Sequence, residues 1–455
     1  MHTTRRLLDL RVFGALVLAV GVADATASCS SDRKDELGGE EDASAPVPPA
    51  LEDGSADDGG ADDGGPADAT APDADPVKPD ASQLPVVCTG ASCATSLVTT
   101  MGEGFCVLLQ DKTVACWGDN ANRQLGRGPE VDTTPSGSAA RVLNLTDIVS
   151  LDRACAIDKN GDTWCWGTGP WLRTSAATTT EPTPIKLPIP PAKMIRVARS
   201  STNAGTACAL VDDGVLCWGT NVNGQVMVPV PGAAASKAYP PTEAGVPPGA
   251  PIRDLAMGDA TFAIRDDGTV LSWGANPPIG RVSALFPDPY PRPLALTDIL
   301  HLEAANDNVC AVAGLAVYCW GRPKGTSLGG LPPLDRALPE RVVMPESVVF
   351  VTTPGSLNNT ANPLRGCAVG ASGSLYCWGE NARGQVGDGT RTYALSAVKI
   401  ASLPEPVAQV RTTPLATCAL LTSGRVFCWG DDSVGQLGGG QLRVASLVPK
   451  EVVLP

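Results

Sequence analysis

The 455-residue chain has 48 acidic and 34 basic residues, a net charge of −14, and only two histidines, His2 and His301. Residues 30–86 hold 16 acidic and 3 basic residues, a net charge of −13, which with +1 for residues 1–29 leaves −2 for residues 87–455. A nearly neutral domain without a basic cluster has no electrostatic footprint for nucleic acid, so we expect no nucleic-acid partner.

Residues 1–28 resemble an export signal. Arg5, Arg6 and Arg11 precede or begin an apolar stretch at 12–22, and small residues follow it. This stretch is too short to span a bilayer. We therefore predict that residues 1–28 are a signal peptide and that the protein is exported.

Two cleavage sites fit this signal. Residues 25–27, Ala-Thr-Ala, suit release of a soluble, secreted protein, whereas residues 26–29, Thr-Ala-Ser-Cys, resemble the lipobox of bacterial lipoproteins, although Thr26 stands where a large aliphatic residue is usual. The chain has 15 cysteines, and Cys29 alone is left over once the others are paired as described below. We predict a lipid anchor on Cys29 as the only membrane contact. A stray thiol or an intermolecular bridge is the alternative.

Residues 29–86 are rich in Asp, Gly, Ala and Pro and contain no aromatic residue. Such a segment cannot bury a core, and its charges repel one another. We predict a disordered, acidic tether, with a specific acidic ligand site as the alternative.

Residues 87–455 repeat one phrase seven times. Each copy is an apolar run, a polar turn and a second run that closes on Trp-Gly, which predicts a β-hairpin. The tryptophans follow one another at intervals of 47 to 58 residues, at Trp117, Trp166, Trp218, Trp273, Trp320, Trp378 and Trp429. A fixed period of this length is typical of a repeat architecture.

Two cysteines bracket six of the seven hairpins. Residues opposite each other in a non-hydrogen-bonded antiparallel pair have Cα atoms about 4.5 Å apart, which a disulfide can bridge. In the seventh copy Phe262 and Ser272 replace both cysteines, as expected if the two sites form a pair. The predicted disulfides are Cys106–Cys116, Cys155–Cys165, Cys208–Cys217, Cys310–Cys319, Cys367–Cys377 and Cys418–Cys428, and Cys88 with Cys93 is a further plausible pair.

Each repeat supplies further strand candidates around its hairpin, such as residues 146–151 and 183–187. Four short antiparallel strands cannot bury their faces alone, so seven units are expected to stack radially as an all-β, seven-bladed β-propeller. One candidate at 444–454 follows the last hairpin and one at 96–100 precedes the first. We expect these two segments to complete one blade between them, so that N- and C-terminal strands close the circle.

The last repeat, CALLTSGRVFCWG at 418–430 followed by GQLG at 435–438, is similar to the regulator of chromosome condensation repeat, and the resemblance covers about 95–455. It implies a seven-bladed propeller. Members of that family include a nuclear guanine-nucleotide exchange factor, membrane-associated exchange factors and a secreted bacterial inhibitor of β-lactamases. The hairpin cysteines indicate an oxidising compartment, which argues against exchange activity on a nuclear GTPase.

The sequence predicts no catalytic, cofactor-binding or metal-ligating residue. A histidine-dependent triad would rest on His301 alone, and we expect this residue to be a structural one on the strand before a hairpin. Residues 158–162, Asp-Lys-Asn-Gly-Asp, superficially resemble a calcium loop, but they lack its later Gly and Glu and coincide with a hairpin turn. We predict no cofactor.

The connections at 168–193, 227–251, 275–297 and 322–346 are long, rich in proline and unlike one another. Loops on a regular scaffold commonly carry recognition, although neutral surface variation explains any single loop as well. The leading hypothesis is an exported, surface-anchored, monomeric propeller that binds a protein or another cell-envelope macromolecule as a scaffold or adhesion module. The alternatives are a secreted inhibitor of another protein, favoured by an aromatic-rich loop face, and a hydrolase or lyase with a carboxylate cluster in the central channel.

Overall fold

The computed structural model describes residues 82–90, 92–172, 178–199, 205–226, 238–321, 336–355 and 365–455. All of them belong to one compact unit that runs from Pro76 to Pro455. The predicted signal peptide and Cys29 lie outside the described residues. Both stay predictions, as do the domain boundaries at 28/29 and 86/87.

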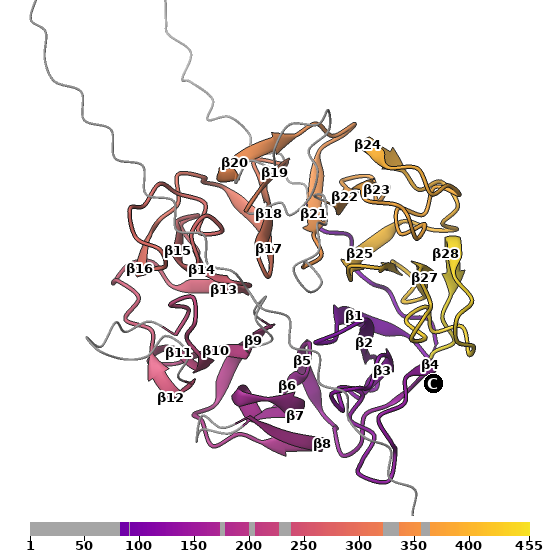
Figure 1. Ribbon diagram of the computed structural model, residues 1–455, viewed down its shortest axis with the longest axis horizontal. Helices are drawn as coiled ribbons and strands as arrows, with labels where there is room; N and C mark the ends of the chain where they lie inside the picture. Colours follow the sequence, from indigo (N-terminus) through magenta and orange to yellow (C-terminus); the bar gives the residue numbers. More distant parts are fainter. Residues whose placement is uncertain are drawn as a thin grey trace, which may run out of the picture. The chain divides into compact units, whose positions relative to one another are not determined.

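The described residues form seven four-stranded antiparallel sheets, the blades, which stand around a common centre (Figure 1). Blades 1 to 4 consist of β1 (Ala94–Thr99), β2 (Gly104–Leu109), β3 (Val114–Gly118) and β4 (Ser136–Arg141); β5 (Ile148–Asp152), β6 (Cys155–Asp158), β7 (Thr163–Gly169) and β8 (Thr179–Lys186); β9 (Ala192–Arg199), β10 (Gly205–Val211), β11 (Gly214–Thr220) and β12 (Ala238–Glu243); and β13 (Ile252–Met257), β14 (Ala260–Arg265), β15 (Val270–Gly274) and β16 (Asp288–Pro293).

Blades 5 to 7 consist of β17 (Ile299–Ala305), β18 (Asn308–Ala313), β19 (Ala316–Gly321) and β20 (Arg336–Val342); β21 (Val348–Thr352), β22 (Gly366–Gly370), β23 (Leu375–Gly379) and β24 (Ala394–Lys399); and β25 (Val407–Thr412), β26 (Ala416–Leu421), β27 (Val426–Gly430) and β28 (Ser446–Glu451). A 3-10 turn, η1 (Pro170–Leu172), follows β7. No helix in the described part of the chain is long and apolar enough to cross a membrane.

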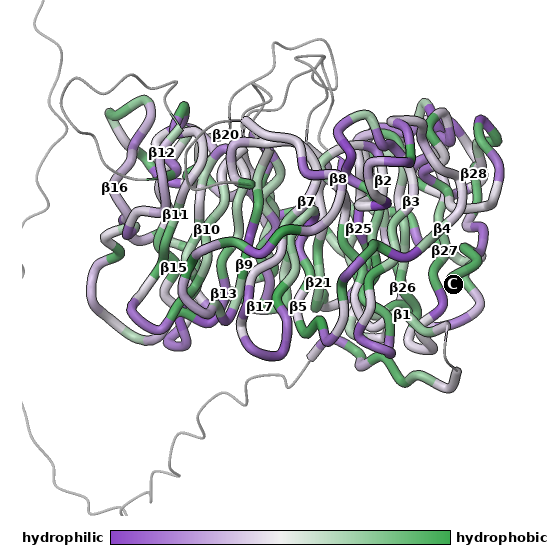
Figure 2. Tube along the Cα trace, turned by 90° about the horizontal axis from the view of Figure 1, so that it is seen from below, coloured by the Kyte–Doolittle hydropathy of each residue, from purple (hydrophilic) through white to green (hydrophobic). Residues whose placement is uncertain are grey.

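The first strand of every blade lies nearest the centre (Figure 1). We call the end of the blades that carries the hairpin turns between second and third strands the turn face. The opposite end carries the connections between third and fourth strands, and we call it the loop face. Figure 2 shows the ring from the side, with apolar stretches running through its body.

The repeated hairpin forms the middle of each blade, and its register brings the two cysteines directly opposite each other, as at Cys418 and Cys428. The Cα atoms of each hairpin pair are 4.1 Å apart, and all six hairpin disulfides expected from the sequence are present. A seventh disulfide joins Cys88 to Cys93. Seven disulfides indicate an oxidising, extracytoplasmic environment.

Blade 4 lacks a disulfide and fills the same position by packing. Phe262 lies directly opposite Ser272 and is fully buried. Its ring contacts Trp320 of blade 5 edge-on, with 6.0 Å between ring centroids. Ser272 Oγ accepts a 3.2 Å hydrogen bond from Arg281 Nε. An apolar contact and a new hydrogen bond therefore replace the covalent link.

The repeated tryptophans join neighbouring blades. Trp166 donates its indole N–H to the backbone carbonyl of Gln124 in the preceding blade at 2.8 Å, and Trp273 bonds to Gln225 in the same way. The same bond runs from Trp218 to Trp171, from Trp320 to Pro278, from Trp429 to Gln385 and from Trp117 to Gln436. In blades 1, 3, 6 and 7 the acceptor is the glutamine of the turn after Trp-Gly, so this glutamine serves the next blade.

The predicted sharing of one blade by the two chain ends is wrong. β1 belongs to the sheet β1–β4 and β28 to the sheet β25–β28, so every blade consists of consecutive strands. Each hairpin already has one strand before it and one after it; residues Val407–Thr412 supply the strand that the prediction sought at the N-terminus. Blades 1 and 7 meet face to face, with a shared apolar core that includes Phe105, Val107 and Leu420.

Residues 82–90, with 92 and 93, form an N-terminal strap on the turn face of blade 7. Gln83 Nε2 donates to the carbonyl of Ala408 at 2.8 Å, and the amide of Val87 donates to the carbonyl of Thr422 at 2.7 Å. The strap then enters β1, whose first amide donates to Gly424 at 3.0 Å. The chain therefore reaches blade 1 across the turn of blade 7.

Candidate functional sites in the channel and on the loop face

A cavity of about 250 Å³ lies in the central channel, between first strands of different blades. Side chains alternate along a strand, so residues two apart, such as His301 and Glu303 on β17, both line it. The titratable side chains of this lining are Asp152, Arg153, Arg196, Asp254, His301, Glu303 and Arg411. The carboxylates that the enzyme hypothesis requires in the channel are thus present.

Arginines pair with two of these carboxylates. Arg196 Nη2 lies 2.8 Å from Asp254 Oδ1, and Arg411 Nη1 lies 3.2 Å from Glu303 Oε2. Asp152 Oδ2 accepts the backbone N–H of Val197 at 2.7 Å. Each of these contacts joins two different blades, so the channel charges act first as links between blades.

Among these arginines, Arg411 contacts the largest number of blades. Besides Glu303 of blade 5, it donates from Nε to the carbonyl of Leu97 in blade 1 at 3.1 Å. Its guanidinium also lies over the ring of Phe350 in blade 6, at 4.8 Å from the ring centroid. One side chain of blade 7 therefore contacts three other blades.

His301 lies on the strand before a hairpin, where the sequence placed it. Its ring stacks on Phe350 with 4.0 Å between centroids, and Nε2 is 3.9 Å from Glu303 Oε2. Burial, reinforced by Arg411 and Arg196, lowers the pKa of His301 to about 3. The imidazole is therefore neutral at physiological pH and cannot supply a proton there.

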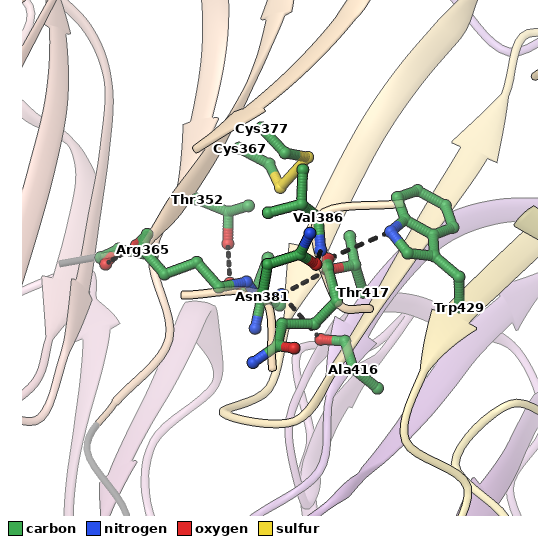
Figure 3. Close-up of a disulfide and its surroundings, with 12 residues drawn as sticks. Thr352, Arg365, Cys367, Cys377, Asn381, Val386, Ala416, Thr417 and Trp429 are labelled. Atoms are coloured by element: carbon green, nitrogen blue, oxygen red, sulfur yellow. Dashed lines mark hydrogen bonds between the residues drawn. A yellow bond between two sulfur atoms is a disulfide. The ribbon is translucent and has the colours of Figure 1, made fainter. Parts of the chain in front are cut away.

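A second polar cluster joins blades 1, 6 and 7. Its members Arg365, Ala416 and Thr417 lie in the surroundings of the Cys367–Cys377 disulfide (Figure 3). Arg365 is 2% exposed and donates to the carbonyls of Thr413 at 2.8 Å and Ala416 at 3.1 Å, and to Thr417 Oγ1. Thr413 Oγ1 in turn donates to Glu103 Oε2 at 2.5 Å.

Burial raises the pKa of Glu103 to about 7, against the lowering effects of Thr413 and Arg365. Burial also lowers the pKa of Arg365 to about 9. A carboxyl with a pKa near neutrality is a candidate proton carrier. Glu103, however, accepts its hydrogen bond from Thr413, whose hydroxyl also accepts the backbone N–H of Ala416. The cluster is therefore a structural contact between blades. No motif or spacing in the sequence pointed to this cluster.

Metal ligands do not cluster in the described ranges: no group of three or more His, Cys, Asp or Glu side chains there is placed to hold a metal ion. Asp158 accepts the amides of Asn160 and Asp162 at 2.8 and 3.1 Å. Residues 158–162 therefore form the hairpin turn that the sequence predicted.

Four long connections were singled out in the sequence, and outer strands run through all of them. β8, β12, β16 and β20 lie within 168–193, 227–251, 275–297 and 322–346. Residues 173–177, 227–237 and 322–335 fall outside the described residues. Only the connection at 275–297, in blade 4, is described throughout.

The blade-4 loop, residues 275–287, presents apolar side chains to solvent on the loop face. Val282 is 83% exposed, Leu285 46% and Phe286 74%. Ala284 and Pro287 are exposed as well, and residues 282–287 include no charged residue. We call residues 282–287 the apolar tip.

Buried polar contacts hold the apolar tip in place. Arg281 Nη1 lies 2.6 Å from Asp288 Oδ2, with the two side chains 11% and 3% exposed. Asn276 Nδ2 donates to the carbonyls of Ser283 at 3.0 Å and Leu285 at 3.1 Å. Although burial alone would raise it, the pKa of Asp288 is lowered by its bonds to Arg281 and Ser283. The ion pair therefore persists near neutral pH, and the tip is a fixed surface.

Known proteins resemble this chain in sequence. The family description "Regulator of chromosome condensation (RCC1) repeat" matches residues 415–436. The ultraviolet-B receptor UVR8 of Arabidopsis thaliana is 26% identical over 361 residues, which cover 76% of this chain and 79% of the receptor. Protein pim1 of Schizosaccharomyces pombe is 27% identical over 336 residues, covering 63% of this chain and 59% of that protein.

Solved structures share the fold. Prp20p of Saccharomyces cerevisiae, whose structure was described with its binding to Gsp1p and histones, superposes with a TM-score of 0.60 at 20% identity, covering 74% of this chain and 85% of that chain. Human WBSCR16 gives a TM-score of 0.58 at 19% identity, covering 75% and 94%. The chain therefore has the fold of a seven-bladed β-propeller, and its sequence is similar to RCC1-repeat proteins.

Proposed function

We propose that this protein is an exported, surface-anchored propeller that binds a partner protein through the apolar tip of blade 4. The observation that carries the proposal is the exposed, uncharged run at 282–287. Single exposed apolar residues are ordinary, whereas consecutive ones on a soluble domain usually mark an interaction site.

The construction of the tip favours binding. Arg281, Asp288 and Asn276 fix the loop before any partner arrives, so little conformational entropy remains to be lost on association. Phe286 at the exposed end is the type of large side chain that anchors protein interfaces. The tip therefore has a rigid base and an apolar anchor.

Export and anchoring belong to the same proposal. The disulfides support an oxidising compartment, and the lipobox-like residues before Cys29 motivate a lipid anchor. The domain is expected to act as a monomer at the cell surface, held by its acidic tether.

A secreted inhibitor is the second candidate. Phe286 and the half-exposed Tyr290, 74% and 45% exposed, favour it because they place aromatic rings on the loop face. Both candidates use the same surface. They differ in the mature N-terminus, which is a lipid-modified Cys29 in the first and an unmodified residue in the second.

The test compares capture of envelope proteins by the exported protein and by Phe286→Ser. The control is Leu395→Ser, which removes a side chain 71% exposed on the outer strand of blade 6. We expect one envelope protein to be captured by the natural chain and by the control and to be lost with Phe286→Ser, at unchanged melting temperature. Equal capture by all three proteins would exclude the tip as the contact.

A further inference from the structure

We propose that the central channel binds one small zwitterion, a free amino acid, through Asp152 and Arg153 of blade 2. Both residues line the channel cavity of about 250 Å³ described above. Asp152 ends β5, the strand of blade 2 nearest the centre (Figure 1), and Arg153 begins the short connection to β6. No residue of the apolar tip lines this cavity, so the proposal is independent of the proposed function.

Arg153 is a cation that the protein leaves unpaired. Arg196 and Arg411 bond to carboxylates of the channel, whereas Arg153 makes no hydrogen bond or ion pair with the residues that the structure describes. Its side chain is partly buried, yet none of its nitrogens is closed off from solvent. Its N–H donors are therefore available to a ligand, and a guanidinium holds a carboxylate by two parallel hydrogen bonds.

Asp152 supplies the opposite charge. Its Oδ2 accepts the backbone N–H of Val197 at 2.7 Å, which fixes the carboxylate against blade 3. No arginine of the described ranges lies at ion-pair distance from it, and its Oδ1 keeps accessible surface. An ammonium group only donates hydrogen bonds, so a carboxylate oxygen without a donor is a suitable partner for it.

The charges of the cavity favour a ligand that is neutral overall but carries both signs. The described lining has as many arginines as carboxylates, and His301 is neutral near pH 7. The charged members are Arg153, Arg196, Arg411, Asp152, Asp254 and Glu303. A simple anion would be repelled by the carboxylates and a simple cation by the arginines, whereas a zwitterion can place each charge against its opposite.

The spacing of the two partners points to an amino acid. Asp152 and Arg153 are neighbours in the chain, and the ammonium and carboxylate of an amino acid are joined by a single carbon. One small molecule can therefore meet both side chains. Leu151, Leu255 and Met257 also line the cavity, which suits a small apolar side chain on the ligand.

Calorimetric titration of the full exported protein tests the ligand class. L-alanine and L-leucine are the zwitterionic probes. N-acetyl-L-alanine lacks the ammonium group, and L-alaninamide lacks the carboxylate, although each keeps the methyl side chain. We expect at least one zwitterion to bind and both blocked forms to bind at least about tenfold more weakly, since each loses a charge-assisted hydrogen bond.

Substitutions test the site. Arg153→Gln should weaken binding about tenfold, whereas Arg153→Lys keeps the charge and should bind more tightly than Arg153→Gln. Asp152→Asn retains an oxygen for the Val197 amide and should weaken binding as well. The matched control is Arg391→Gln, which changes an exposed arginine outside the cavity and should bind like the natural protein. Melting curves confirm that each variant is folded.

The outcomes separate this site from the proposed function. Phe286→Ser changes the apolar tip and should bind the amino acid like the natural protein, whatever happens to partner capture. The proposal is overturned if neither zwitterion binds, if a blocked form binds as tightly as L-alanine, or if Arg153→Gln binds as well as Arg391→Gln.

Discussion

Trp117 of the first blade donates its indole N–H to the carbonyl of Gln436 in the last blade, at 3.1 Å. Bonds of the same kind join five other pairs of neighbouring blades, so the seam between the last and first blades is built like those. Leu97 adds to it, because its amide donates to Gln409 Oε1 of blade 7 at 3.0 Å.

Replacing Trp117 by Phe should destabilise the ring as much as replacing Trp273. Each change leaves a buried carbonyl without its donor, which costs about 1–3 kcal/mol. Unfolding in urea measures the effect, with Trp164→Phe, whose partly exposed indole bonds to Asp158 at 3.1 Å, as the control. A Trp117 variant as stable as the natural protein would show that the seam between blades 7 and 1 does not depend on this bond.

Glu103 should make stability fall as pH rises. Its pKa is about 7 in the folded protein against an ordinary 4.5, so the folded state holds the proton more tightly and loses stability between pH 4.5 and 7. Glu103→Gln should therefore be more stable than the natural protein at pH 8, and the difference should shrink toward pH 4.5. Free energies of unfolding across this range provide the measurement, and a constant difference would contradict the assignment.

His301 should act in the opposite direction. Its folded pKa of about 3 lies below the ordinary 6.5, so stability present above pH 6.5 is lost as pH falls toward 3. His301→Phe can keep the stack on Phe350 and should lose less stability between pH 6.5 and 4. Partner capture at pH 7.5 should be the same for both proteins, because the neutral imidazole transfers no proton. A loss of any measurable turnover in this variant would instead restore the enzyme hypothesis.

Phe262→Cys with Ser272→Cys should form a seventh hairpin disulfide, since the two residues are directly opposed as in the other blades. The short loop favours the folded state by about 2.5–3 kcal/mol, while loss of the buried Phe262 ring costs about 3–5 kcal/mol. The double variant should thus be no more stable than the natural protein. Non-reducing peptide mapping and a melting curve check both parts, and a clear gain in melting temperature would show that Phe262 contributes less than its burial indicates.

Mature protein should begin at a lipid-modified Cys29. Mass spectrometry of the N-terminal peptide from the envelope fraction gives the answer. An unmodified start at Ser28 would instead support soluble secretion, and with it the inhibitor hypothesis.

The hairpins could be predicted from the sequence because each of three markers, the two cysteines and the Trp-Gly pair, indicates the same strand register. The channel residues were not, since the turn before the hairpin varies: Asp152 precedes its cysteine by three positions and Glu303 precedes its own by seven. No fixed offset from the repeat therefore marks a residue that faces the centre.

The loops show a similar limit. The connection at 275–297 stood out in the sequence, but its exposed tip depends on Arg281 and Asp288 meeting across the loop, which spacing alone does not reveal. The missing Gly-Gln turn of blade 2 was visible in the sequence as well. That Trp171 would take the place of the glutamine and leave its nitrogen unpaired became apparent only in three dimensions.

The N-terminal strap has a mechanical consequence. Tension applied to the chain ahead of Ser82 reaches Gln83 and Val87 before it reaches β1, and both residues bond to blade 7. A pull on the tether is therefore shared by the last and first blades and loads their seam along its length. The double variant Gln83→Ala, Val87→Pro removes both bonds. In single-molecule stretching from the N-terminus we expect the natural protein to open at higher force than this variant.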